Sequence, residues 1–301
     1  MSESKTLDLI KKILLWTFPI IFIMGSFGNI ISFIIFRSDK FKNTIFYTYF
    51  SILNILNTIT ITYSINDFLS YQYGISIQNT SVYFCKLNLY IIYSMAPVAS
   101  YIIVIVGLDR MISIICPCKF TFRNSIIFQY AICLPLLIFN MAFYTPLIIY
   151  SDYELVINNA TNSTSYECKL NDNGLTYKMD LFNSTIVPFI LMISSTSVTI
   201  YGLFNSRKKA NNKINKKDIR FALTSIFLDI CFFILNLPIA LYLYLSDYIY
   251  IDSKLGDFLY VVTSVFYYMN FGVMFYINFY VNNVFKKELQ SLYIRRFHLN
   301  K

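Results

Sequence analysis

The sequence predicts an all-α membrane protein, a bundle of seven transmembrane helices with a short amphipathic helix after the seventh span. Of the 301 residues, 56% are hydrophobic and only 14% are charged, whereas a soluble domain carries about 25% charged residues. Seven apolar stretches approach the roughly 20 residues that a helix needs to cross a bilayer. These stretches cover residues 13–36, 44–66, 88–116, 125–149, 182–204, 219–246 and 256–281.

The first stretch follows Lys11 and Lys12, as the apolar part of a signal peptide would. Its apolar run is longer than the 7–15 residues of a signal sequence, and no small-residue cleavage site ends it. We therefore interpret it as a retained helix. The chain then divides into a short extracellular N-terminus (1–12), which is too short to fold, a seven-helix domain (13–281), and a cytoplasmic helix and tail (282–301).

The orientation follows from the distribution of charge. The connections after the first, third and fifth stretches and the tail are basic, and the other connections are acidic. The most basic connection carries Arg207, Lys208, Lys209, Lys213, Lys216, Lys217 and Arg220. Short basic loops stay in the cytoplasm, so we expect a multi-pass plasma-membrane protein with its N-terminus outside. A basic inner face attracts anionic lipid, and we do not interpret it as a nucleic-acid site.

Glycosylation signals agree with this orientation. Asn79, Asn159 and Asn162 each begin an Asn-X-Ser/Thr sequence in a connection assigned to the outside, where such asparagines accept glycans. Asn183 also matches, but we expect it to lie too near the membrane to be modified.

Two cysteines fall on the oxidising side. Cys85 precedes the third helix and Cys168 lies in the second outer connection. We expect a disulfide between them that ties this connection across the mouth of the bundle. Cys133 and Cys231 fall within helices, where we expect small apolar packing residues.

The inner end of the third helix carries Asp109 and Arg110. Charged residues at the end of an apolar helix are costly unless they are paired or functional; an arginine that only reaches the interface is the simpler alternative. Cys85 precedes Arg110 by 25 residues, about seven helical turns. One helix would therefore carry both the disulfide and the charged pair.

With these features in place, the chain resembles the rhodopsin-like family of G-protein-coupled receptors. The residues that carry the resemblance are Gly28, Asn29, Cys85, Asp109, Arg110, Pro188 and Pro238. The resemblance implies a receptor that binds an extracellular ligand, with a peptide as one candidate, and activates a heterotrimeric G protein.

The resemblance also assigns roles to particular residues. Asp218 corresponds to the acid that holds Arg110 in resting receptors, so these two residues and Asp109 would form a two-state latch. Asn29, Asn57 and Asn270 would form a polar network in the core. The residues after the seventh stretch would form the family's short helix on the inner membrane surface. Its apolar stripe would consist of Phe285, Leu289 and Leu292.

Several positions depart from the family pattern. Asn57 replaces the usual acid of the second helix, Met111 the usual tyrosine after the arginine, and Asn236 the usual tryptophan of the sixth helix. The seventh helix has no proline near Met274. Because proline kinks a helix, we expect this helix to be straighter than in relatives of the family.

The ligand is approached by exclusion. Ile92 stands where amine receptors have an acid, so a cationic amine would lack its counter-ion. Tyr268 stands where opsins have the retinal lysine, so a Schiff base with retinal is excluded. The remaining candidates for ligand contact, for which ordinary packing is the alternative role, are Asn88, Tyr93, Tyr242, Tyr260 and Tyr267.

Asp229 is the one carboxylate expected in the middle of the membrane. It is either a proton- or ion-sensitive switch or a neutral group hydrogen-bonded to Ser194, Ser195 or Thr196.

Other functional classes fit less well. The single histidine, His298, lies in the tail, and no nucleophile or metal cluster is found at membrane depth, so we expect neither an enzyme nor a cofactor. The remaining alternatives are a seven-helix protein that does not couple to a G protein and a small-molecule chemoreceptor or transporter-like protein.

Overall fold

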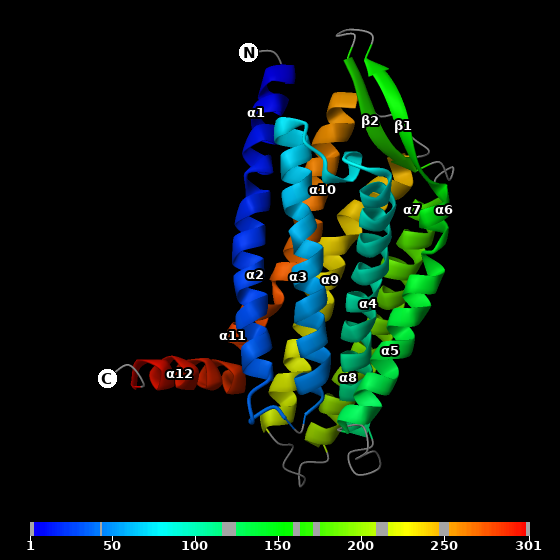
Figure 1. The fold of residues 1–301 in the computed structure, drawn as a ribbon. Helices are drawn as coiled ribbons and strands as arrows, with labels where there is room; N and C mark the ends of the chain where they lie inside the picture. Colours follow the sequence, from blue (N-terminus) through cyan, green and yellow to red (C-terminus); the bar gives the residue numbers. More distant parts are fainter. Residues whose placement is uncertain are drawn as a thin grey trace.

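The computed structural model describes residues 3–42, 44–115, 125–158, 163–170, 175–208, 216–246 and 253–298. Long helices run side by side, and a two-stranded hairpin covers one end of the bundle (Figure 1). The first helix begins at the hairpin end, and the last helix lies across the opposite end (Figure 1). The elements are α1 (Glu3–Leu15), α2 (Thr17–Phe36), α3 (Ile45–Tyr73), α4 (Val82–Ile115), α5 (Ile126–Phe143), α6 (Pro146–Tyr150), β1 (Ser151–Asn158), β2 (Ser163–Leu170), α7 (Leu175–Asp180), α8 (Val187–Lys208), α9 (Lys216–Ser246), α10 (Ser253–Gly272), α11 (Met274–Val281) and α12 (Asn283–His298).

Five to six helices in the described part of the chain are long and apolar enough to cross a membrane. The five straight candidates are Ile10–Phe36, Val82–Ser113, Ile126–Tyr150, Leu175–Gly202 and Leu223–Ser246. The sixth is a bent pair, Leu255–Gly272 with Met274–Val281. The chain therefore has the architecture of a multi-pass helical membrane protein.

α3 is as long as these spans but more polar, because one of its faces lies inside the bundle. Its buried polar residues recur every three or four positions, which places them on one helix face. They are Thr48, Ser51, Asn54, Asn57, Thr60 and Ser64. Other positions of the helix, such as Ile55 and Ile59, are exposed and apolar.

The first helix starts earlier than the sequence indicated. α1 begins at Glu3 and leads directly into α2, with a break at Trp16, so residues 3–12 are helical, which the sequence did not indicate. Extending an existing helix avoids the unfavourable nucleation step. Lys11 also forms an ion pair with Asp257 of α10, with 2.8 Å between Nζ and Oδ2, so α1 contacts α10.

The fifth predicted helix contains a π-helical turn, Leu181–Ile186, immediately before α8. Pro188 follows this turn. Proline has no N–H, and its ring clashes with the carbonyl four residues earlier in a regular helix. A widened turn before the proline is a common way to avoid that clash, and such turns often lie at functional sites.

The seventh predicted helix is bent, and the expectation of a straighter helix was wrong. α10 and α11 meet at an angle of 51°. The side-chain amide of Asn29 donates to the carbonyl of Phe271, 3.1 Å away, at the bend. Gly272 packs so closely on α2 that an added Cβ would lie 3.2 Å from Gly25 Cα. Glycine and a side chain bonded to the helix backbone both bend helices without proline.

Aromatic side chains fill the end of the bundle next to α12. Phe36 is fully buried and contacts Phe41, Phe50 and Phe285, with ring centroids 4.9–5.3 Å apart. The stripe formed by Phe285, Leu289 and Leu292 packs against this core. It therefore attaches α12 to the bundle, although the helix itself points away from it (Figure 1).

Candidate functional site

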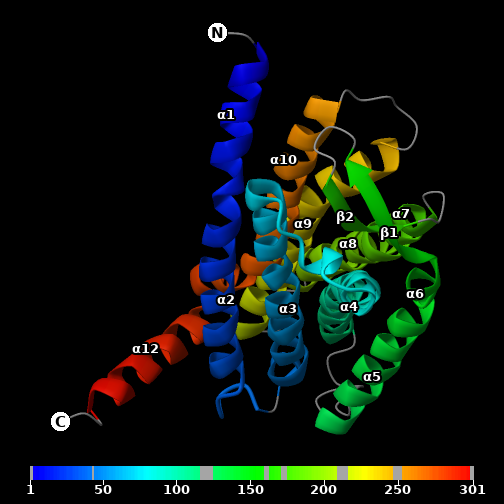
Figure 2. The same ribbon diagram turned by 45° about the horizontal axis from the view of Figure 1, so that its top comes forward.

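The hairpin is held to α4 by a disulfide. Antiparallel strands β1 and β2 pair Tyr153 with Cys168. Cys168 is bonded to Cys85 in the first turn of α4, with Cα atoms 5.5 Å apart, so the predicted disulfide is present. Figure 2 shows the hairpin in front of α8 and α9 and beside α4. The strands themselves were not predicted.

Asn79 supports the same hairpin from the α3–α4 connection. Its side-chain oxygen accepts a hydrogen bond from the backbone N–H of Cys168 at 3.0 Å, and its carbonyl accepts one from the Tyr153 hydroxyl at 2.9 Å. Asn79 therefore has a structural role besides any glycan. The other two predicted acceptors, Asn159 and Asn162, lie outside the described residues.

A cavity of about 300 Å³ lies beneath the hairpin. This volume is at the lower end of the range for small-molecule sites. α3, α4, β2, α7, the π-helical turn, α9 and α10 all contribute to its wall. The predicted ligand contacts that line it are Asn88, Tyr93, Tyr260 and Tyr267. The fifth candidate, Tyr242, instead donates from its hydroxyl to the Gly256 carbonyl at 3.0 Å and joins α9 to α10.

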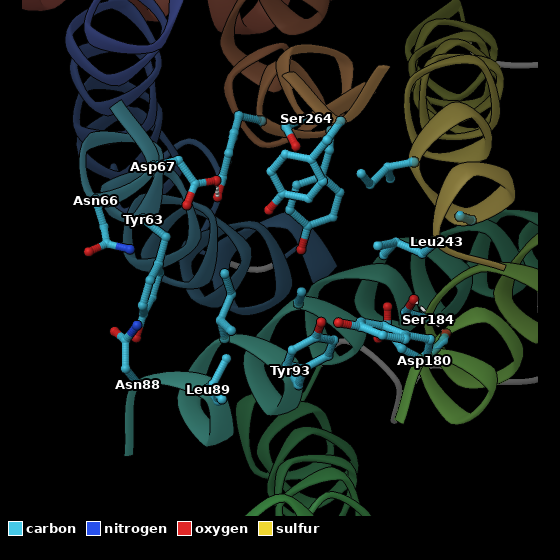
Figure 3. A pocket seen from close by; sticks show the side chains of 18 of the residues that line it. Tyr63, Asn66, Asp67, Asn88, Leu89, Tyr93, Asp180, Ser184, Leu243 and Ser264 are labelled. Atoms are coloured by element: carbon cyan, nitrogen blue, oxygen red, sulfur yellow. Dashed lines mark hydrogen bonds between the residues drawn. The ribbon is translucent and has the colours of Figure 1, made fainter. Parts of the chain in front are cut away.

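Two carboxylates that sequence reasoning missed also line this cavity, Asp67 of α3 and Asp180 of α7. Asp67 accepts a hydrogen bond from the Tyr268 hydroxyl at 2.7 Å. Asp180 accepts one from the Tyr144 hydroxyl at 3.1 Å. Figure 3 shows the two acids on opposite sides of the cavity. Asp67 continues the inward stripe of Thr60 and Ser64 at helical spacing, which is the signal that could have identified it.

A buried polar network positions Asp180. Asn183 in the π-helical turn is only 7% exposed. Its amide donates to Asn140 Oδ1 at 2.9 Å and to the Tyr144 oxygen at 3.4 Å, and its Oδ1 accepts from the Tyr101 hydroxyl at 3.0 Å. The same Tyr144 hydroxyl donates to Asp180. The network therefore links α4 and α5 to one acid of the cavity.

The three asparagines expected to form a polar network are only partly together. Asn57 and Asn270 line a second, very small cavity of about 10 Å³, which has room for about one water molecule. Asn29 bonds to the Phe271 carbonyl instead. Within the described part of the chain, no direct hydrogen bond joins the three side chains.

Asp109 and Arg110 lie near the α12 end of α4. Arg110 Nη2 is 3.4 Å from Asp109 Oδ2, and its guanidinium carbon lies 4.9 Å from the centre of the Phe46 ring. Ser113 also lies within hydrogen-bonding distance of Asp109. Asp218 belongs to α9, but its side chain falls outside the described part, so its contact with Arg110 stays a prediction.

Asp229 of α9 accepts a hydrogen bond from the hydroxyl of Thr196 in α8. Thr196 is one of the three partners considered from the sequence. The Asp229 side chain is 93% buried, and its Oδ1 has no hydrogen-bond partner among the described residues. This contact joins α8 to α9 halfway along their length.

Fold and site together define a multi-pass α-helical membrane protein with a polar cavity at one end. No protein-family model matches this sequence, and the search of curated proteins finds no match to it. The function is therefore argued from the residues of this chain.

Proposed function

We propose that this protein is a seven-transmembrane receptor of the rhodopsin-like type, which binds an extracellular ligand and activates a heterotrimeric G protein. The observation that carries the proposal is the layout of α4. Its 34 residues correspond to about 50 Å. One end holds the Cys85 disulfide and the cavity wall, and the other holds Asp109 and Arg110.

A count of seven spans is part of this proposal. α3 has 29 residues, or about 43 Å of helix, which exceeds the roughly 30 Å of a hydrocarbon core. Its low apolarity follows from the buried polar face described above, and exposed Ile55 and Ile59 suit a lipid-facing side. α3 and the bent pair α10–α11 bring the five straight spans to seven. Because short basic loops stay in the cytoplasm, the proposal puts α12 on the cytoplasmic side of the plasma membrane.

The proposed signal passes along α9. This helix supplies Asn236 and Leu243 to the cavity, and Asp218 lies in its first turn at the other end. A ligand that shifts the cavity end of α9 would move the end near Arg110. Arg110 would then leave Asp218 and open the bundle to the G protein, as in a two-state latch.

The test is nucleotide exchange by a panel of G proteins in membranes that contain the full chain. We expect Asp218→Ala to raise basal exchange because it frees Arg110, and Arg110→Ala to abolish exchange. Arg37→Ala is the matched control, since Arg37 follows α2 and packs on Tyr47. Unchanged exchange in a surface-expressed Asp218→Ala variant would contradict the latch. If Arg37→Ala lost as much nucleotide exchange as Arg110→Ala, the effect would not be specific to Arg110.

A further inference from the structure

The two acids of the cavity have no basic partner among the residues that the structure describes. Neither Asp67 nor Asp180 forms an ion pair with a described lysine or arginine; the nearby Lys11 pairs with Asp257 instead. Each acid accepts a hydrogen bond from a tyrosine hydroxyl. A hydroxyl is a neutral donor, so it orients a carboxylate without neutralising it. A partly buried carboxylate in this situation is costly unless it takes up a proton or pairs with a cation.

The rest of the wall also suits a positive charge. Among the described residues that line the cavity there is no lysine, arginine or histidine. Six of those residues are tyrosines: Tyr63, Tyr93, Tyr177, Tyr260, Tyr267 and Tyr268. Aromatic rings attract ammonium and guanidinium groups through their faces, and sets of such rings recognise organic cations. An anionic ligand would meet two like charges here.

We propose that the ligand of this cavity carries an organic cation, an ammonium or guanidinium group, which pairs with Asp67 or Asp180. The inference rests on the proposed receptor function and specifies the class of its ligand. It differs from the expectation, based on Ile92, that a cationic amine would lack its counter-ion. Ile92 does line the cavity where amine receptors have an acid, but acids from α3 and α7 supply the counter-charge instead.

The geometry favours two separate anchoring points. Asp67 and Asp180 come from different elements and face each other across the cavity (Figure 3). A volume of about 300 Å³ lies at the lower end of the range for small-molecule sites, which suits a small amine or one residue of a peptide. The cation could therefore belong to a free amine or to the amino terminus of a peptide.

The test measures thermal unfolding of the purified full-length protein in detergent micelles at fixed ionic strength. The probes are phenethylamine, 2-phenylethanol and phenylacetate, which differ mainly in the charge of one end. A second arm compares Phe-Ala-Ala amide that has a free amino terminus with its N-acetylated form. We expect the cationic member of at least one arm to raise the unfolding temperature, and the neutral and anionic members to leave it unchanged. The arm that responds identifies the source of the cation.

Variants assign the effect to the two acids. Asp67→Asn and Asp180→Asn each keep an oxygen for the tyrosine hydroxyl, so we expect the fold to be retained. The variant that removes the acid paired with the cation should weaken binding about ten-fold or more, and the other variant should weaken it less. Asp257→Asn is the matched control, because Asp257 pairs with Lys11 and is not part of the cavity wall. The inference would be overturned if the neutral or anionic probes stabilised the protein as much as the cations, or if neither cation stabilised it. An equal loss of cation binding in Asp257→Asn would also overturn it. Because no G protein is present, these results are independent of the coupling assay.

Discussion

Replacing Asn183 with leucine should destabilise the bundle by breaking the network that positions Asp180. Leucine has the same number of side-chain heavy atoms and the same branching but no polar group, so the change removes hydrogen bonds without leaving a cavity. The two shorter contacts of Asn183 join it to Asn140 and Tyr101 at 2.9 and 3.0 Å. A third, to Tyr144, is 3.4 Å long and contributes less.

The expected loss follows from these contacts. Hydrogen bonds between membrane helices contribute about 0.6 kcal/mol each, so two contribute about 1.2 kcal/mol. Asn140 is fully buried, and a buried acceptor that finds no new partner costs about 1–3 kcal/mol. We therefore expect Asn183→Leu to lower the free energy of unfolding by about 1–4 kcal/mol.

The assay is reversible unfolding of the purified protein in mixed micelles, applied to a double-mutant cycle with Tyr101→Phe. Because both changes remove the same hydrogen bond, the double variant should be more stable than the sum of the single losses predicts, by about 0.5 kcal/mol or more. Tyr90→Phe is the control, since Tyr90 lies on the same helix and donates to the Met141 carbonyl instead. Additive losses for Asn183 and Tyr101 would refute the network.

Three further predictions follow from single contacts. Gly272→Val should lower the free energy of unfolding by about 1–3 kcal/mol through overpacking, because even a Cβ at this position lies 3.2 Å from the α2 backbone; unchanged stability would contradict the close contact. Asn79→Ala should speed hydrogen exchange at the Cys168 amide, whereas Asn79→Asp, which keeps the acceptor oxygen but removes the glycan site, should not. Asp229→Asn should lower the unfolding free energy less than Asp229→Leu does, because an amide oxygen also accepts from Thr196; a loss as large as that of Asp229→Leu would favour the ion-sensitive interpretation.

Much of the fold could be predicted from the sequence because lipid imposes simple requirements. A helix must satisfy its own backbone hydrogen bonds in a bilayer, so each long apolar stretch indicates a helix, and five straight spans begin and end near the expected residues. α3 was predicted as a span from its apolar residues, but its buried polar stripe lowers its apolarity. That stripe is a consequence of packing against other helices.

Prediction of the site was less complete. The disulfide was predictable because Cys85 and Cys168 are the two cysteines on the same side. Asp67 and Asp180 stand at the ends of connections that the sequence predicts to be acidic, and a one-dimensional sequence does not show which loop-end residues turn inward. Tyr242 was expected in the cavity and instead joins two helices. The direction of the Tyr242 side chain depends on the rotation of α9 about its axis, and packing against neighbouring helices fixes that rotation.

By itself the sequence determined the membrane environment, the approximate helix limits and the disulfide, since each follows from local composition or from compartment. The tertiary structure alone decided the bend at Gly272 and the position of the hairpin over the cavity. It also decided that two acids and six tyrosines line the same cavity. These features depend on contacts between residues far apart in the chain: Gly25 with Gly272, Asn79 with Cys168, and Tyr268 with Asp67. Such contacts arise from the rotation and spacing of packed helices, which no local pattern specifies.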